Sequence, residues 1–139
     1  MHQYTNRGSS MARGFSKEAL RGHACAVMRE LGKGHRERVY HRAMITSLNQ
    51  AGVHHRSEVP SPLYCMGEVV GVGRCDLVIG DLIIEIKANT LHPCKVISQL
   101  QKYTLNLGRA EHKRYRGMIL NFNQETGAVQ TLILKKKKG

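Results

Sequence analysis

The sequence is poor in acidic residues, and this imbalance is its strongest compositional feature. Its 139 residues contain 10 Asp and Glu against 22 Lys and Arg, which gives a formal net charge of +12. A field of this sign attracts polyanions, chiefly nucleic acid or an acidic membrane surface. So large an excess in one small domain favours nucleic acid over the alternative of a merely soluble basic protein.

The sequence also lacks the cysteine spacings of common metal centres. Its four cysteines are Cys25, Cys65, Cys75 and Cys94. They form no CxxC pair, which argues against a zinc ribbon or knuckle, and their spacing does not suggest an iron–sulfur cluster. We therefore expect neither centre, but reduced and mostly buried thiols in an intracellular protein. The sequence does not distinguish a cytoplasmic, nuclear or organellar location.

Long apolar runs are absent as well. No stretch approaches the length that spans a bilayer, and residues 1–16 lack the apolar core of a signal peptide, so we expect no membrane partner. Hydrophobic residues still make up 41% of the chain, which is enough for one folded domain. We predict a flexible basic arm over residues 1–15, a single domain over 16–134 and a lysine-rich tail over 135–139.

Apolar periodicity and turn residues outline the secondary structure. Helices are expected between the cap Ser16 and the stop Gly32, over residues 35–50, and from about 93 to Gly108. Strands are expected over residues 53–59, 63–65, 68–72, 74–79, 82–88, 117–122 and 128–134, with Pro60 and Pro62 breaking the first of them. This order of elements indicates an α/β or α+β fold with a mixed sheet.

The candidate chemistry lies on a predicted hairpin whose two-residue turn is Gly80-Asp81. Counting back from this turn places Asp76 opposite Glu85, with both side chains on one face and their Cβ atoms roughly 5 Å apart. Lys87 lies two residues beyond Glu85 and shares its face. The neighbouring residues are apolar, so two carboxylates here would repel each other and lose hydration unless a cation lay between them.

Magnesium is the natural candidate for this cation. It prefers oxygen ligands and usually takes one or two protein carboxylates, which leaves sites for water and phosphate. An ion so placed can activate water and stabilise charge on a phosphodiester, while Lys87 orients or helps to deprotonate the water. The alternative is a structural hairpin in which Arg74 and Lys87 neutralise two stray carboxylates.

Two of the motifs resemble those of a known nuclease superfamily. Asp76 followed by Glu85-Ile86-Lys87 resembles the D…(D/E)xK signature of PD-(D/E)xK nucleases. Gln99 and Tyr103 form a QxxxY motif similar to that of RecB-like members, and their spacing puts them on one helix face. The alternative for this second motif is an ordinary amphipathic helix with Tyr103 in its core stripe.

A third motif narrows the resemblance. Gly34, Glu37 and Tyr40 form a GxxExxY pattern similar to the signature of the GxxExxY proteins, a small PD-(D/E)xK family. The similarity extends over roughly Leu20 to Phe122. By this resemblance Glu37 would approach the metal as a further carboxylate. The alternative is a solvent-exposed Glu37 that pairs with Arg38 or His41.

The resemblance implies a fold, a cofactor and a reaction. The fold is a restriction-endonuclease-like core, in which a mixed central sheet is flanked by helices. The activity is that of an Mg²⁺- or Mn²⁺-dependent nuclease that acts on phosphodiester bonds of DNA or RNA, with Lys87 assisting the attacking water. The implied site consists of the metal ligands Asp76, Glu85 and Glu37, together with Lys87, Gln99 and Tyr103.

Basic residues outside the motifs are candidates for phosphate contacts. They are Arg74, Lys95, Lys102, Arg109, Lys113, Arg114, Arg116, Lys135, Lys136, Lys137 and Lys138. The same charge, with an aromatic content of only 5%, supports a second hypothesis. The protein would then be a non-catalytic nucleic-acid-binding subunit of a nucleoprotein particle, such as a ribosome or packaged genome, that reuses the nuclease fold. A protein-interaction adaptor is a third hypothesis, and it leaves the carboxylates unexplained.

Overall fold

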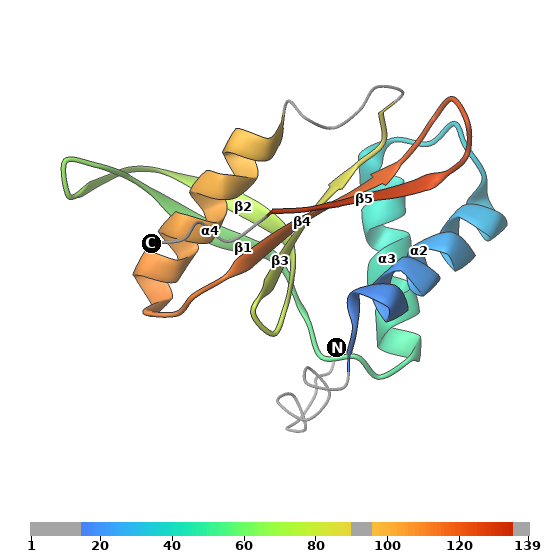
Figure 1. Ribbon diagram of the computed structural model, residues 1–139, viewed down its shortest axis with the longest axis horizontal. Coiled ribbons are helices and arrows are strands. Elements are labelled where there is room, and N and C mark those ends of the chain that lie inside the picture. The colour runs from blue at the N-terminus through green and yellow to red at the C-terminus, as the bar shows by residue number, and fades with distance from the viewer. Residues whose placement is uncertain (1–14, 90–95, 135–139) are drawn as a thin grey trace.

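The structure is a computed structural model that describes residues 15–89 and 96–134 (Figure 1). Its helices are α2 (Lys17–Leu31), α3 (Glu37–Gln50) and α4 (Ile97–Glu111). Its strands are β1 (Arg56–Cys65), β2 (Glu68–Ile79), β3 (Leu82–Lys87), β4 (Arg116–Phe122) and β5 (Val129–Ile133). The predicted basic arm before residue 15, Lys95 and the lysine-rich tail lie outside the described residues.

One five-stranded sheet organises the molecule. Its strand order is β1-β2-β3-β4-β5, with β3 and β4 parallel and the other neighbours antiparallel. Helices α2 and α3 pack on one face of the sheet and α4 on the other (Figure 1). This confirms the predicted α+β class with a mixed central sheet between helices, an architecture consistent with a restriction-endonuclease-like core.

The hairpin of β2 and β3 is buried on both faces, as its apolar sequence predicted. Leu77 and Ile84 join the cluster under α2 and α3. Val78 and Ile83 point the other way and join the cluster under α4. Because successive residues of a strand face opposite sides, this run of apolar residues fills both layers of the core at once. It also puts the adjoining acidic residues close to the centre of the domain.

The first helix follows its sequence signals, and the second begins later than predicted. The side chain of Ser16 caps α2 by accepting a hydrogen bond from the N–H of Ala19 at 3.0 Å, and α2 ends at Gly32. Helix α3 begins at Glu37 rather than at residue 35, because Gly34 has a φ of +101° and Arg36 is extended. These two conformations interrupt the helical path.

Strand β1 corrects the prediction that prolines break it. It continues through Pro60 and Pro62 as the edge of the sheet, where only one side of the strand needs ladder hydrogen bonds. Residues 68–72 and 74–79 likewise form the single strand β2, which passes through Gly73. Together β1 and β2 make a long hairpin that extends beyond α4 (Figure 1).

Helix α4 ends later than predicted. Gly108 lies inside the helix, which continues to Glu111, and His112 takes the left-handed conformation with a φ of +54°. A Cβ on Gly108 would lie 2.6 Å from the main-chain oxygen of Lys113, so glycine is needed here for close approach rather than for termination. No helix in the described ranges is long and apolar enough to span a bilayer.

Candidate active site

The register of the β2–β3 hairpin is the predicted one. Ile79 pairs with Leu82, Val78 with Ile83, and Leu77 with Ile84. Gly80 has a φ of +58°, which suits the first position of a tight two-residue turn. The pairing therefore brings the next residues on each strand, Asp76 and Glu85, to facing positions.

The regular strand pairing stops at these carboxylates. The N–H of Ile86 donates to Oδ2 of Asp76 at 2.8 Å, and the N–H of Asp76 donates to Oε1 of Glu85 at 3.3 Å. Each carboxylate therefore accepts a hydrogen bond from a main-chain N–H at the point where the strands diverge. These bonds fix Asp76 and Glu85 beside one another without neutralising either charge.

Burial opposes ionisation of both carboxylates. Only 4% of Glu85 is exposed, and burial together with the charge of Asp76 raises the pKa of Glu85 to about 8. Burial also raises the pKa of Asp76, although the Ile86 N–H and the charges of His41 and Lys87 oppose that shift. Metal coordination favours the deprotonated form of a carboxylate, so a cation would remove this penalty.

The structure does not provide the salt bridges of the purely structural alternative. Among the described residues, the ion pairs within 4.0 Å are Arg56 with Glu111 and Arg116 with Asp81. Neither Asp76 nor Glu85 belongs to such a pair. The buried Glu85 and the half-buried Asp76 are the kind of donor set that suits Mg²⁺, which needs few protein ligands and retains several waters.

Helix α3 closes a cavity over this end of the hairpin. The cavity has a volume of about 330 Å³ and is lined by Glu37, Arg38, His41, Glu58, Asp76 and Ile86. Glu37 thus lies near Asp76, and its charge also contributes to the raised pKa of Glu85. Glu85 and Lys87 do not line this cavity. Within the described ranges, no three His, Cys, Asp or Glu side chains are spaced to hold a metal by themselves, so water and substrate would have to complete the coordination.

Sequence reasoning did not place four residues of this cavity in the site, namely Arg38, His41, Glu58 and Ile86. Glu58 lies on β1 between the pairs Ser57–Leu77 and Val59–Cys75, opposite Asp76, and its charge helps to raise the pKa of Asp76. The Nε2–H of His41 donates to the main-chain oxygen of Asp76 at 2.9 Å. The spacing of four residues between Glu37 and His41 was a signal for a shared helix face. Extending the register argument to β1 would have suggested Glu58, once β1 was recognised as continuous.

The two residues of the QxxxY pattern contact each other on α4. The side-chain N–H of Gln99 donates to the hydroxyl oxygen of Tyr103 at 3.0 Å. Tyr103 is buried, and its ring lies over Gly73, where an added Cβ would be 2.7 Å from Cε1 of the ring. Burial and the charge of Glu85 raise the pKa of Tyr103, which places the hydroxyl within the field of the carboxylates. Tyr103 is therefore both a core residue and a neighbour of the site.

The predicted phosphate-binding residues fall into two groups. Exposed side chains belong to Arg74, Lys102, Arg109, Lys113 and Arg114. In contrast, the guanidinium of Arg116 binds both carboxylate oxygens of Asp81, at 2.9 and 3.1 Å. Arg109 stacks over the ring of Tyr64, with its guanidinium carbon 4.2 Å from the ring centre.

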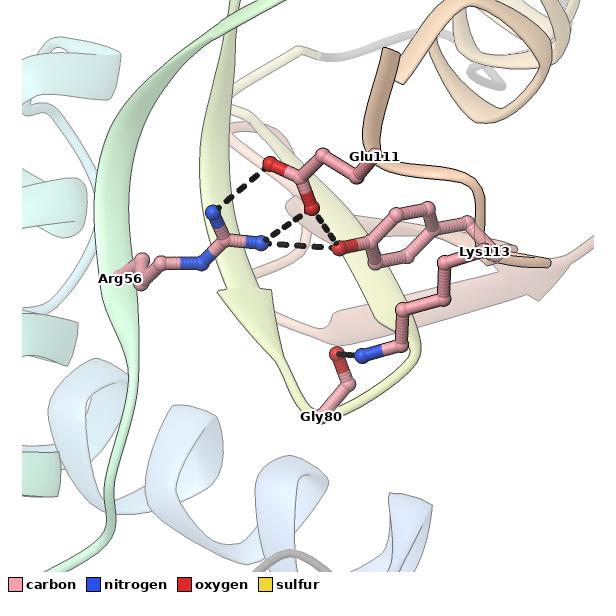
Figure 2. A network of polar contacts seen from close by, with 5 residues as sticks. Arg56, Gly80, Glu111 and Lys113 are labelled. Carbon is pink, nitrogen blue, oxygen red and sulfur yellow. Dashed lines mark hydrogen bonds and ion pairs between the residues drawn. The ribbon is translucent and has the colours of Figure 1, made fainter. Parts of the chain in front are cut away.

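A further polar network near the Gly80-Asp81 turn joins β1 to the end of α4 and to the segment that follows α4 (Figure 2). Arg56 on β1 binds both carboxylate oxygens of Glu111 on α4, at 3.0 and 3.1 Å, and also donates to the hydroxyl of Tyr115 at 2.9 Å. The ammonium of Lys113 donates to the main-chain oxygen of Gly80 at 3.2 Å. These contacts give Lys113 a partner in the fold and tie α4 to the sheet.

A larger cavity lies beside the turn of the β2–β3 hairpin and is a weaker candidate for a reaction site. It has a volume of about 620 Å³, and its lining includes Phe15, Lys17, Asp81 and Arg116. The opposite charges of Asp81 and Arg116 are paired there, so these two groups are occupied by the fold. The unpaired carboxylates make the smaller cavity the better candidate for a reaction site.

Comparison with known proteins agrees with this geometry. Residues 16–132 match the family model described as the PD-(D/E)XK nuclease superfamily. A search of curated proteins found no match to the chain. The matched region includes the carboxylate hairpin, all three described helices and every strand except the last residue of β5. The chain belongs to the PD-(D/E)XK nuclease superfamily.

Proposed function

We propose that the protein is a metal-dependent nuclease of the GxxExxY group, which hydrolyses phosphodiester bonds in nucleic acid. The observation that carries the proposal is a pair of facing carboxylates, the buried Glu85 and the half-buried Asp76, which have no cationic partner within 4.0 Å among the described residues. Such a pair costs stability in the free protein and is useful when it binds a divalent ion. Membership of the nuclease superfamily implies a nucleic acid substrate.

The site residues have distinct proposed roles. Asp76 and Glu85 would hold Mg²⁺ or Mn²⁺, and Glu37 would contribute through the cavity that it shares with Asp76. When bound, the ion supplies an activated water and stabilises the charge that develops on the phosphoryl group. Lys87 lies two residues beyond Glu85 and would orient that water or accept its proton.

Residues around this core would shape the site and hold the substrate. Gln99 and Tyr103 form a hydrogen-bonded pair near Glu85 and would limit the space beside it. The exposed cations Arg74, Lys102, Arg109 and Arg114 would contact phosphates through charge, without reading sequence. Lys113 would do so only by giving up its bond to Gly80. Lys95 and the lysine tail are proposed as further phosphate contacts on sequence alone.

A second candidate function is supported by the net charge of +12. The protein would bind nucleic acid as a non-catalytic subunit of a nucleoprotein particle inside the cell. Its affinity would come from the exposed basic residues, and the hairpin carboxylates would play no part in it. Strong salt dependence of binding is expected for either function, so only cleavage separates the two.

Cleavage assays with purified protein test the proposal. Single- and double-stranded DNA and RNA are incubated with Mg²⁺, with Mn²⁺ and with EDTA. We expect cleavage that requires the ion and disappears in Asp76→Ala and Lys87→Ala. Glu68→Gln serves as a matched control, because this exposed carboxylate lies on the same strand as Asp76 but at its far end. Tight, salt-sensitive binding without cleavage, unchanged in the site variants, would overturn the nuclease proposal and favour the particle subunit.

A further inference from the structure

Gln124, which follows β4 and belongs to none of the predicted motifs, connects three segments of the molecule. Its side-chain Oε1 accepts a hydrogen bond from the N–H of Gly34 at 2.5 Å. Its Nε2 donates to the hydroxyl oxygen of Tyr40 at 3.0 Å and to the main-chain oxygen of Phe122 at 2.8 Å. One side chain therefore holds both the glycine and the tyrosine of the GxxExxY pattern against the end of β4.

The loop before α3 makes two other side-chain hydrogen bonds. The ammonium of Lys33 donates to the main-chain oxygen of Glu125 in the β4–β5 turn at 3.1 Å, and the Nε2–H of His35 donates to the main-chain oxygen of Leu31 at 3.0 Å. Arg36 stands at the N-cap of α3 but makes no capping hydrogen bond with its side chain. Gly34 takes a left-handed conformation with a φ of +101°, which favours glycine at this position. Glu37 is the first residue of α3 and directly follows this uncapped loop. Its direction therefore depends on how firmly the loop is held to the β4–β5 turn.

The tyrosine contributes to the same restraint. The hydroxyl of Tyr40 donates to the main-chain oxygen of Gly32 at 2.7 Å while it accepts from Gln124. The ring of Tyr40 is fully buried and stacks on Phe122, with ring centres 4.5 Å apart. Tyr40 thus anchors the start of α3 in the core, and Gln124 joins that anchor to the loop that carries Gly34.

Gln124 also contacts the segment that follows Lys87. Its main-chain N–H donates to the main-chain oxygen of Asn89 at 3.1 Å. The N–H of Asn89 donates in turn to Oδ1 of Asn121 at 3.0 Å, and Asn121 is fully buried and lies beside Lys87 in the parallel pairing of β3 and β4. The same turn therefore restrains the strand of Lys87 and the helix of Glu37.

We infer that Gln124 is a positioning residue, which fixes the approach of Glu37 to the carboxylate hairpin by holding Gly34 and Tyr40. Gln124 acts on Glu37 through the loop, and it is not proposed to touch metal or substrate. The inference deepens the proposed nuclease function and rests on it for the role of Glu37. The restraint itself is a property of the fold and can be measured without cleavage.

The first test measures the restraint directly in Gln124→Met, which retains the length of the side chain but loses both polar atoms. Hydrogen exchange is followed by NMR for the amides of Gly34 and of the first turn of α3. We expect exchange at Gly34 to become about tenfold faster, because its acceptor is gone, while the second half of α3 is unaffected. Gln101→Met, at an exposed position on α4, should leave these amides unchanged. Unchanged exchange at Gly34 in Gln124→Met would overturn the inference.

The second test asks whether Gln124 acts through Glu37. At limiting Mg²⁺, Gln124→Met should lower the cleavage rate about tenfold, since small displacements of a site residue have large effects on rate. In an E37Q background the same substitution should change the rate less than about twofold, because its effect depends on Glu37. Equal loss in both backgrounds would show a general structural effect and would overturn the positioning role. If the wild-type protein does not cleave, the nuclease proposal fails, and the exchange measurement still decides the restraint.

Discussion

The two ends of the β2–β3 hairpin carry acidic residues in opposite electrostatic states. At the turn, the guanidinium of Arg116 binds Asp81 and lowers the pKa of that carboxyl. At the opposite end of the hairpin, called the open end, lie Asp76 and Glu85. Burial raises the pKa of Glu85 to about 8 and also raises that of Asp76. The same hairpin therefore presents one carboxylate that the fold has paired with a cation and two that have no cationic partner within 4.0 Å among the described residues.

This difference separates a structural role from a functional one. An exposed ion pair such as that of Asp81 contributes modestly to stability and needs no ligand. Buried carboxylates that face each other oppose folding unless protons or a metal ion neutralise them. A raised pKa next to a cavity is thus a better sign of a site than the presence of acidic residues alone.

The largest expected effect is on the cleavage rate, which should depend on the open end of the hairpin and not on the turn. Glu85→Gln should lower Mg²⁺-dependent cleavage by about a thousandfold or more, because it removes a proposed metal ligand while preserving size and hydrogen bonding. Asp81→Asn should change the initial cleavage rate less than about threefold. Comparable losses in the two variants would show that the open end has no special part in the reaction.

The next effect concerns stability as a function of pH. Between the ordinary pKa of Glu85, 4.5, and its value in the fold, about 8, the native protein binds more protons than the unfolded chain. The free energy of unfolding in EDTA should therefore fall by on the order of 2–4 kcal/mol as pH rises from 5 to 8, with Asp76 acting in the same direction. Glu85→Gln should flatten this fall, as measured by urea denaturation at each pH. A profile in EDTA that is equally steep in the variant would contradict the assignment to Glu85.

The stabilisation by Mg²⁺ should depend on pH as well. Mg²⁺ should stabilise the wild-type protein more at pH 8 than at pH 6, since the ion competes with protons.

A smaller effect tests how α4 supports the open end. Tyr103 approaches β2 because Gly73 has no side chain, and a Cβ there would lie 2.7 Å from the ring. Gly73→Ala should therefore displace the ring and lower the free energy of unfolding by about 1–3 kcal/mol. Gly71→Ala is a matched control on the same strand, where a Cβ would lie 3.4 Å from a flexible leucine side chain. Equal losses in the urea midpoints of the two variants would show that the ring is not closely packed at Gly73.

The smallest expected effect is the change in stability when the ion pair at the turn is removed. Asp81→Asn should lower the free energy of unfolding at pH 7 by only about 0.5–1 kcal/mol, because both partners of its ion pair are substantially exposed. The pKa of Asp81 is lowered in the fold, so this contribution is present above its ordinary value of 3.8 and is lost as pH falls further. The two ends of the hairpin should thus depend on pH with opposite signs. Denaturation midpoints of Asp81→Asn and Glu85→Gln at pH 4 and pH 8 measure this contrast. If the effects of the two substitutions on stability changed with pH in the same direction, the proposed contrast between the two ends would be wrong.

Local sequence determined the centre of the fold and the core of the candidate site. The turn Gly80-Asp81 fixed the register of β2 and β3, because a two-residue turn leaves few pairings and the strand period sets the faces. The facing of Asp76 and Glu85 followed directly from that register. The pair Gln99 and Tyr103 followed from the helical period in the same way.

Only the tertiary structure decided which distant groups meet these carboxylates. Strand β1 became one continuous edge strand, and this brought Glu58 opposite Asp76. Packing of α3 over the sheet placed Glu37 and His41 at the same cavity. Turn chemistry and residue periodicity act over a few neighbouring residues, whereas these contacts depend on which faces pack together when the whole core closes. The same closure paired Arg116 with Asp81 and left Glu85 without a cationic partner within 4.0 Å in residues 15–89 and 96–134, and no local pattern in the sequence predicts either outcome.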